Sequence, residues 1–297
     1  MGGKAKNMEE IREKAYAKLN ISLDVTERRA DGYHDMVMLM QSVSLCDELR
    51  LTPNDSGMLT ASCNLRFIPT DERNLAIRAA RRYLEAVGES GLGLHIDMRK
   101  SIPVGAGMAG GSADAAAVLR GLNRMLGHHL DRESLEALAC LVGSDVAFCV
   151  SGGTSLAKGR GELLTPLKSL PDCCFAICKP EFSISTPELF RKLDETPLRR
   201  HPDTAGLLRA VEAGSLEEIC RRMYNVFEDV PDRRMRTVSE IKNSLLDHGA
   251  LGAIMTGTGS AVFGVFSREE QAAQAVAALK KEYRFAFLAK PVERLEP

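Results

Sequence analysis

Apolar and polar residues alternate in the first part of the chain, as they do in strands that bury one face. Residues 15–25, AYAKLNISLDV, follow this period and are rich in β-forming side chains. Asp31-Gly32 is a turn signal, the apolar run at residues 36–45 resumes the strand pattern, and a second turn is expected at residues 53–57. The pattern predicts short strands in hairpin-like order within a mixed sheet.

The pattern changes to helical spacing at residues 71–88, which end in glycine as helix C-termini commonly do. Alternation returns at residues 91–103 and predicts a strand with its apolar residues on one face. A glycine-rich loop follows this strand. Helices are predicted at residues 112–126 and 133–145, and residues 145–167 favour strand and turn.

The composition changes to a loop containing proline and leucine at residues 164–171. We place a boundary there, between a domain of residues 1–165 and a domain of residues 166–297. The second domain is predicted to contain a strand, a helix, a strand–turn–strand unit, a helix and a closing strand, at residues 172–180, 185–194, 249–266, 269–283 and 285–292. Because strands and helices interleave without regular βαβ spacing, we predict an α+β fold of two domains.

Composition and charge narrow the class of protein. The chain has 297 residues, of which 44% are hydrophobic and 27% charged, which is typical of a soluble globular protein. A formal net charge of −1 provides no bulk field for nucleic acid or an anionic membrane, so we expect neither as a partner. No apolar run approaches the roughly 20 residues that span a bilayer, and the polar N-terminus lacks the apolar region of a secretory signal. We therefore predict a cytoplasmic protein.

The eight cysteines form no CxxC pair, and a chain of this size does not need a disulfide framework. The cluster CCFAIC contains Cys173, Cys174 and Cys178 and lies in an apolar, strand-like stretch without a histidine at ligand spacing. We predict that these cysteines are buried core residues rather than metal ligands.

The strongest chemical signal is the segment PVGAGMAGGSADAAAVLRGLN at residues 103–123. Its glycines remove Cβ atoms, so the backbone can approach a ligand closely. The loop leads into a helix, whose first N–H groups and positive dipole end form an anion site. Ser112 stands where its hydroxyl could cap the helix or meet a phosphate or Mg²⁺. The segment lacks the GK[ST] ending of a Walker A loop, and a flexible loop before a close-packed alanine helix is the competing interpretation.

Two other segments place polar side chains in apolar surroundings. Lys18 and Asn20 share one face of the first predicted strand, where a paired polar site competes with an exposed lysine. Tyr33 and His34 follow the first turn and could stack on or bond a planar ring, or anchor an ordinary turn. Asp145 enters an apolar stretch and needs a partner, for which Lys18 is a candidate, and an N-cap aspartate is the alternative.

Residues 255–266, MTGTGSAVFGVF, place a glycine-rich turn between two strand-like runs. Its backbone and hydroxyls could approach a phosphate, and a plain glycine-rich hairpin is the equal competitor. Taken together and in order, AKLNISLDVTERRADGYHDM, PVGAGMAGGSADAAA, GSDV and TGTGSAVFG resemble the motifs of the GHMP kinases, and the resemblance covers essentially the whole chain.

The resemblance implies the two-domain GHMP kinase fold, with mixed sheets and helices and an active-site cleft between the domains. It also implies ATP as phosphoryl donor, together with Mg²⁺, for which Ser112 is the expected protein ligand. The implied ATP loop consists of Pro103, Val104, Gly105, Ala106, Gly107, Met108, Ala109, Gly110, Gly111, Ser112 and Ala113.

By the same resemblance, Lys18 and Asp145 would be the catalytic pair. Asp145 would accept the proton of the substrate hydroxyl, while Lys18 orients the carboxylate and offsets negative charge. The Arg-Ala-Asp-Gly-Tyr-His turn is the most specific motif. It implies a cytidine diphosphate-linked polyol as substrate, 4-diphosphocytidyl-2-C-methylerythritol, phosphorylated on its 2-hydroxyl in non-mevalonate isoprenoid precursor biosynthesis. Its implied binding residues are Asn20, Tyr33, His34 and Phe190, the last as part of a sandwich around the cytosine ring.

The chain departs from the family pattern at two places. Ala147-Phe148-Cys149 stands where Pro-Phe-Phe is common, and Met108 stands where leucine is common; all are apolar replacements. Two alternatives stay open: another GHMP kinase, acting on homoserine, mevalonate or a sugar, and a nucleotide-binding protein of this fold without catalysis. We expect a monomer or a homodimer.

Overall fold

Two long strands dominate the first part of the chain. In the computed structural model, which describes residues 8–198 and 200–296, β1 (Ile11–Arg28) and β2 (His34–Asn54) pair antiparallel along nearly their whole lengths. The predicted turn joins them, with Gly32 at φ +83°, a conformation that glycine adopts readily. The prediction of several short strands is wrong, because the register continues across three β-bulges instead of ending at them.

Five further strands join this pair in the larger sheet: β3 (Leu59–Cys63), β4 (Gly93–Arg99), β5 (Thr154–Gly159), β6 (Leu163–Pro166) and β8 (Tyr224–Asn225). Among the described residues the order is β3-β4-β2-β1-β8, and β5 pairs with β2 and β6. β3–β4 and β1–β8 are parallel, and the other pairs are antiparallel. The predicted mixed sheet is confirmed.

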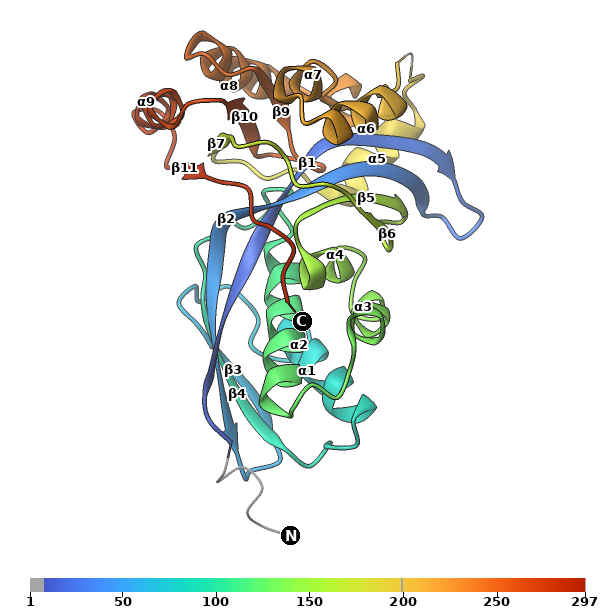
Figure 1. Cartoon of the computed structure of the whole chain (residues 1–297), viewed down its shortest axis with the longest axis vertical. Helices are drawn as coiled ribbons and strands as arrows, with labels where there is room; N and C mark the ends of the chain where they lie inside the picture. The colour runs from blue at the N-terminus through green and yellow to red at the C-terminus, as the bar shows by residue number, and fades with distance from the viewer. Residues whose placement is uncertain (1–7, 199, 297) are drawn as a thin grey trace.

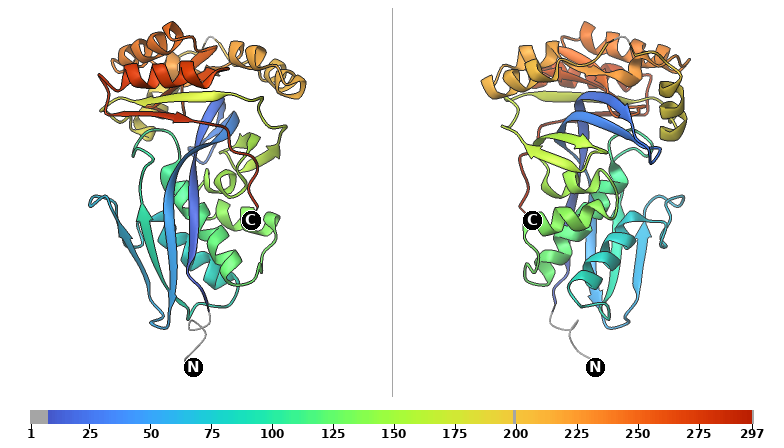
Figure 2. Two further views of the ribbon diagram at one scale, coloured as in Figure 1. Left: turned by 60° about the vertical axis from the view of Figure 1, so that its left-hand side comes forward. Right: turned by 90° about the vertical axis from the view of Figure 1, so that its right-hand side faces the viewer.

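Four helices lie on one side of the larger sheet: α1 (Leu75–Ala86), α2 (Gly110–Met125), α3 (Arg132–Cys140) and α4 (Val146–Ser151) (Figure 2). α2 packs against β1, and all its residues from Ala113 to Asn123 are buried. A Cβ at Gly121 would lie only 2.4 Å from Leu51 Cδ1, so small residues let this helix approach the sheet closely.

The prediction of a strand directly after Asp145 is wrong, because these residues form α4. Every residue of α4 is buried, so its sequence shows no polar face, and a short apolar run does not distinguish a helix from a strand. The rest of that predicted strand and turn segment is confirmed as β5 and β6.

The second half of the chain forms a smaller, antiparallel sheet in the order β11-β7-β10-β9. Its strands are β7 (Cys174–Lys179), β9 (Gly252–Met255), β10 (Val262–Phe266) and β11 (Phe285–Ala289), where the sequence predicts them. Figure 1 shows this sheet at the top of the molecule. The helical segments of this half are α5 (Thr186–Asp194), α6 (Thr204–Ala213), α7 (Leu216–Arg221), the 3-10 helix η2 (Val226–Asp229), α8 (Met235–Asp247) and α9 (Glu269–Leu279).

The two halves exchange segments. β8 belongs to the second half and pairs with β1. After β11, the chain returns to the larger sheet, where the N–H of Val292 donates to Ser42 O at 2.8 Å and that of Leu295 to Ser151 O at 2.7 Å. The division into domains 1–165 and 166–297 stays a prediction, and both of its outer ends lie outside the described residues.

Two other predictions concern the cysteines and the possibility of a membrane-spanning helix. All eight cysteines are free, and Cys173, Cys174 and Cys178 are buried, as predicted for core residues. No cluster of three potential metal-ligating His, Cys, Asp or Glu side chains occurs in residues 8–198 and 200–296. In the same part of the chain, no helix has the length and apolarity to cross a membrane.

Candidate active site

A cavity of about 490 Å³ lies between the two halves of the chain. The first half contributes Lys18, Asp145 and the glycine loop, residues 103–109, with the first turn of α2. The second half contributes Thr186, Phe190, Phe227, Gly257 and Thr258. The cavity therefore brings together residues of all four motifs that the sequence singles out, from positions as far apart in the chain as Lys18 and Gly257.

Positive φ angles give the glycine loop its shape. Gly105 and Gly107 have φ of +66° and +76°, which residues with a Cβ rarely adopt. A Cβ at Gly107 would also lie 2.3 Å from the carbonyl oxygen of Thr256. Both the positive φ angle and this short contact therefore exclude a side chain at Gly107. Ala109, the N-cap of α2, also has positive φ, +58°. Such a conformation persists in a non-glycine residue only where the surroundings impose it.

Backbone hydrogen bonds hold the loop from two directions. The N–H of Lys18 donates to Met108 O at 3.2 Å, and the N–H of Ala261 donates to Ala106 O at 3.1 Å. One bond comes from the long strand β1 and the other from Ala261, which directly precedes β10. These bonds use two of the loop's carbonyl groups and fix the loop between the two halves of the molecule.

The first turn of α2 presents N–H groups to the cavity. Those of Gly110, Gly111 and Ser112 have no backbone acceptor among the described residues, because a helix leaves its first N–H groups unpaired. All three residues line the cavity. With the positive end of the helix dipole, they form a site suited to a phosphate group. Ser112 is not the helix cap, since that position belongs to Ala109.

Lys18 is held by an amide rather than by a carboxylate. Its side chain is on β1, the residue is only 5% exposed, and Nζ donates to Asn20 Oδ1 at 2.5 Å. The prediction that Lys18 and Asn20 share one face is confirmed. Asn20 is fixed in turn by its N–H, which donates to Thr256 Oγ1 at 2.9 Å. Because the amide is neutral, it leaves the charge of Lys18 unbalanced.

Asp145 lies at the N-cap position of α4, as one of the two sequence interpretations has it, but its side chain caps no N–H group. It is half-buried and lines the cavity together with Lys18. The ion pair expected between these two residues is not formed within the described part of the chain, since Lys18 bonds to Asn20 instead. The carboxylate is therefore left facing the cavity for a ligand.

The second glycine-rich turn, between β9 and β10, packs onto the first. A Cβ at Gly257 would lie 2.9 Å from Gly107 O, so the absence of side chains allows the two backbones to touch. Asn225 holds this turn, because its Nδ2 donates to Met255 O and Gly257 O, both at 2.8 Å. Gly257 and Thr258 line the cavity.

Aromatic side chains gather where β2 begins. His34 stacks on Phe190 with centroids 4.8 Å apart, and its Nε2 lies 2.6 Å from Asp194 Oδ1. His34 and Phe190 stack directly on each other in this structure, and the sandwich of the cytosine ring with Phe190 stays a prediction. Tyr33 is 54% exposed, and the guanidinium of Arg160 lies 4.1 Å from its ring centroid.

Not every predicted site residue lines the cavity. Ala113 is buried in α2, and Ala113, Asn20, Tyr33 and His34 all lie outside its lining. Among the other predicted residues, Phe190 and residues 103–112 do line it.

Sequence reasoning missed several cavity residues, among them Lys100, Asp114, Thr186 and Phe227. For Asp114 a signal existed, because a carboxylate in a run of alanines requires a buried partner. The others carry no local pattern that separates them from ordinary surface or core residues.

Two sequence-family models match the chain. GHMP kinases N terminal domain matches residues 74–153, and GHMP kinases C terminal matches residues 207–284. A protein of Alkaliphilus metalliredigens is 40% identical over 288 residues, which are 97% of this chain and 98% of that protein. One of Syntrophomonas wolfei is 43% identical over 276 residues, 93% and 96% of the two chains. Both are named 4-diphosphocytidyl-2-C-methyl-D-erythritol kinase.

Solved structures agree in fold. A 4-(cytidine 5'-diphospho)-2C-methyl-D-erythritol kinase aligns with a TM-score of 0.79 and 34% identity, over 95% of this chain and 99% of that chain. A homoserine kinase from Cytophaga hutchinsonii aligns with a TM-score of 0.75 over 97% and 96%, but at 22% identity, so it supports the fold alone. The predicted α+β fold with a cleft between its halves is confirmed, and the chain belongs to the GHMP kinase family.

Proposed function

We propose that this chain transfers the γ-phosphoryl group of ATP to the 2-hydroxyl of 4-diphosphocytidyl-2-C-methyl-D-erythritol, a reaction of non-mevalonate isoprenoid precursor biosynthesis. The observation that carries the proposal is the convergence of the glycine loop, Lys18 and Asp145 on one cavity. The acceptor is inferred from the names of relatives that match at about 40% identity along nearly the whole chain.

The glycine loop and the first turn of α2 would bind the triphosphate. Unpaired N–H groups and the helix dipole favour phosphate oxygens at this position. Beside the loop, Ile68, Pro69 and Leu75 offer apolar surface to the cavity, which suits the planar base of a nucleotide. Phosphoryl transfer passes through a loose transition state, so the main task of these groups is positioning.

Asp145 would accept the proton of the attacking hydroxyl. Its carboxylate faces the cavity and makes no cap bond, and such base assistance contributes about 10²- to 10⁴-fold. Lys18, whose ammonium bonds only to a neutral amide within the described chain, would offset the charge of the transferring phosphoryl group. This differs from the role of orienting Asp145, for which the expected ion pair would be needed.

The donor set of the cavity also fits Mg²⁺, because the hydroxyl of Ser112 and the phosphates of ATP supply oxygen ligands. The ion would neutralise phosphate charge when bound. Ser112 stays a proposed ligand, and its place in the first turn of α2 is next to the proposed phosphate site.

The acceptor would enter from the side of Phe190. This residue lines the cavity, stacks on His34 and makes a T-shaped contact with Phe227, with centroids 4.9 Å apart, so aromatic rings border the proposed site of transfer. Tyr33 and Asn20 stay proposed binding residues for the acceptor. A cytoplasmic location and a monomeric or homodimeric state also stay predictions.

A panel of acceptors tests the proposal. ADP release from Mg-ATP should depend on 4-diphosphocytidyl-2-C-methyl-D-erythritol and should not occur with homoserine, mevalonate or a sugar. Release with one of those acceptors would assign another GHMP kinase activity. Binding of ATP without release with any acceptor would favour a nucleotide-binding protein without catalysis.

A further inference from the structure

Beside the glycine loop lies a buried charged cluster that the proposed reaction does not use. It consists of Asp47 on β2, Lys100 just after β4 and Asp114 in α2. Their side chains are 0%, 4% and 5% exposed. Lys100 Nζ lies 2.5 Å from Asp47 Oδ2 and also forms an ion pair with Asp114. Charged groups are buried to this extent only when they are paired.

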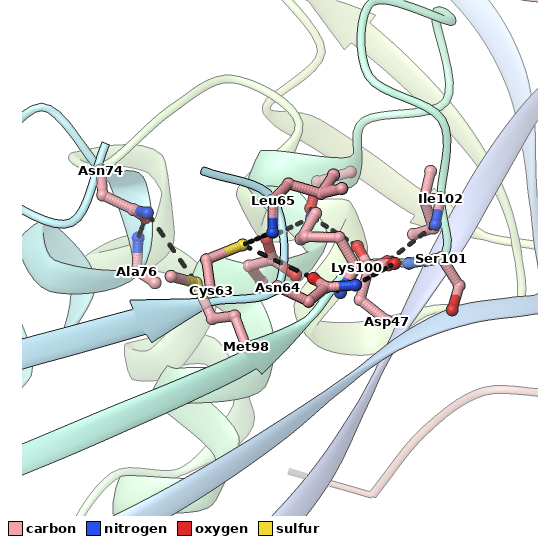
Figure 3. Close-up of polar contacts among 12 residues, drawn as sticks. Asp47, Cys63, Asn64, Leu65, Asn74, Ala76, Met98, Lys100, Ser101 and Ile102 are labelled. Atoms are coloured by element: carbon pink, nitrogen blue, oxygen red, sulfur yellow. Dashed lines mark hydrogen bonds and ion pairs between the residues drawn. The ribbon is translucent and has the colours of Figure 1, made fainter. Parts of the chain in front are cut away.

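The cluster reaches both ends of the glycine loop. Asp47 Oδ1 accepts hydrogen bonds from the N–H groups of Ser101, at 2.5 Å, and Ile102, at 2.7 Å, the two residues that precede the loop. Lys100 Nζ donates to the carbonyl oxygen of Gly110 at 3.3 Å, at the start of α2. Figure 3 shows the first of these contacts, with Asp47 facing Lys100, Ser101 and Ile102.

The backbone of Lys100 is fixed separately. Its N–H donates to Asn64 Oδ1 at 2.8 Å, and Asn64 Nδ2 donates back to its carbonyl oxygen at 3.2 Å (Figure 3). A lysine anchored at its backbone in this way cannot follow α2 if the helix moves. Its side chain therefore sets the distance between the end of β4 and the first turn of α2.

Electrostatic attraction strengthens the contact of Lys100 with Asp47 and Asp114. Burial alone would lower the pKa of Lys100, but the two carboxylates outweigh that effect, and its pKa lies above the ordinary value. The ammonium thus stays charged, while burial raises the pKa of Asp114 to about 7. Asp114 Oδ1 has no hydrogen-bond partner among the described residues, so Asp114 depends on Lys100 for its position.

We propose that Lys100 is a positioning residue for nucleotide binding, which joins the start and the end of the glycine loop through Asp47 and Asp114. By holding the loop closed, it keeps the N–H groups at the spacing that a phosphate group requires. The identity of the ligand rests on the proposed function, whereas the restraint on the loop does not. Lys100 acts through the loop and contacts no reacting atom.

Two variants test this role, Lys100→Met and Asp114→Ala. Removing one partner of a buried ion pair leaves an uncompensated charge. We expect the dissociation constant of Mg-ADP, measured by calorimetry, to rise about tenfold, with kcat at saturating ATP within about twofold of wild type. Hydrogen exchange of residues 101–113 should become faster. Asp114→Asn, which keeps an oxygen acceptor for Lys100, should restore slow exchange and tight binding.

Glu13→Gln is the matched control. The side chain of Glu13 is 7% exposed and pairs with Arg120 and Arg124, which lie farther along α2. The Glu13→Gln substitution should therefore lower thermal stability without changing the affinity for Mg-ADP or the hydrogen exchange of the loop. If Lys100→Met and Asp114→Ala behave as this control does, the cluster is only structural and the proposal is overturned. Should Lys100→Met not fold, Asp114→Ala gives the same comparison. Failure of the proposed function would give a different result. The wild-type protein would then release no ADP with the acceptor, while the hydrogen exchange of residues 101–113 would still differ between wild type and the variants.

Discussion

At the residue scale, Lys18 and Asp145 share a cavity without forming an ion pair. Lys18 bonds to the neutral side chain of Asn20, so its charge is available to phosphate oxygens. A carboxylate already paired with an ammonium would be a weaker base, because a neighbouring positive charge lowers its pKa. The unpaired arrangement therefore favours separate roles, a base for the hydroxyl and a counter-charge for the phosphoryl group.

Lys18→Met tests the counter-charge. Loss of a preorganised donor to a transition-state charge lowers kcat by about 10²- to 10³-fold, and we expect a loss of that size with little change in the affinity for Mg-ADP. Steady-state kinetics and calorimetry measure the two. Lys158→Met, on an exposed part of β5, serves as control. An unchanged kcat, or a Lys18 variant that unfolds, would contradict this role.

At the scale of single elements, the glycine loop depends on its contact with the second glycine-rich turn. Gly107→Ala would place a Cβ 2.3 Å from Thr256 O at φ +76°, whereas Gly88→Ala at φ +74° meets nothing within 4 Å. Both changes cost the strain of a left-handed conformation, about 1 kcal/mol, and only the first also separates the two turns. Gly107→Ala should weaken Mg-ADP binding while Gly88→Ala should not, as calorimetry would show. Equal effects would refute the contact.

A charged cluster links α5 to the start of α8 and gives a pH dependence. Hydrogen bonding by Arg234 first, and then by Lys192, lowers the pKa of Asp232 below its ordinary range, and its side chain is 2% exposed. Because the pKa is depressed in the folded state, the stabilisation is present above the ordinary pKa of an aspartate, about 4, and is lost as pH falls below it.

Asp232→Asn should therefore lower the free energy of unfolding at neutral pH and flatten its decrease in acid. Denaturant titrations at several pH values measure both effects. Asp71→Asn is the control. Asp71 pairs with Arg73, two residues along the same exposed loop, and such a local pair can also form in the unfolded chain. If the two variants show the same acid dependence, the Asp232 cluster does not stabilise the fold.

The sequence predicts well those elements whose conformation depends on residues close together in the chain. Gly107 and Gly257 have positive φ angles, which glycine adopts readily, so the two glycine segments carry their structural signal in the sequence. α4 has no such signal, because every side chain is buried by partners from elsewhere in the chain. Lys100 and Asn225 also escape sequence reasoning, since their partners lie on other elements.

At the scale of the whole molecule, the two sheets are tied together by the chain after β11. Figure 1 shows this segment, in red, running from the smaller sheet down beside the larger one. Val292 and Leu295 donate to Ser42 and Ser151, and Arg132 Nη1 donates to Leu295 O at 2.9 Å. Ser151 ends α4, the helix that begins after Asp145, so the segment also supports the cavity wall.

Val292→Pro removes one of these bonds and tests how much the segment after β11 stabilises the fold. Losing a backbone hydrogen bond costs about 1 kcal/mol, which corresponds to about 2–4 °C in melting temperature for a protein of this size. Glu293→Pro is the neighbouring control, because Glu293 is exposed and its N–H has no backbone acceptor among the described residues. Calorimetric melting should show a decrease for Val292→Pro alone, and equal melting temperatures would show that the tie contributes little.

The proposed reaction is tested most directly by ADP release from Mg-ATP, with and without 4-diphosphocytidyl-2-C-methyl-D-erythritol, in wild type and in Asp145→Asn. We predict release that requires this acceptor and falls about 10²- to 10⁴-fold in the variant, while calorimetry shows similar Mg-ADP binding by both proteins. Release that is independent of the acceptor, or that persists fully in Asp145→Asn, would contradict the assignment of this cavity as the site of phosphoryl transfer to that hydroxyl.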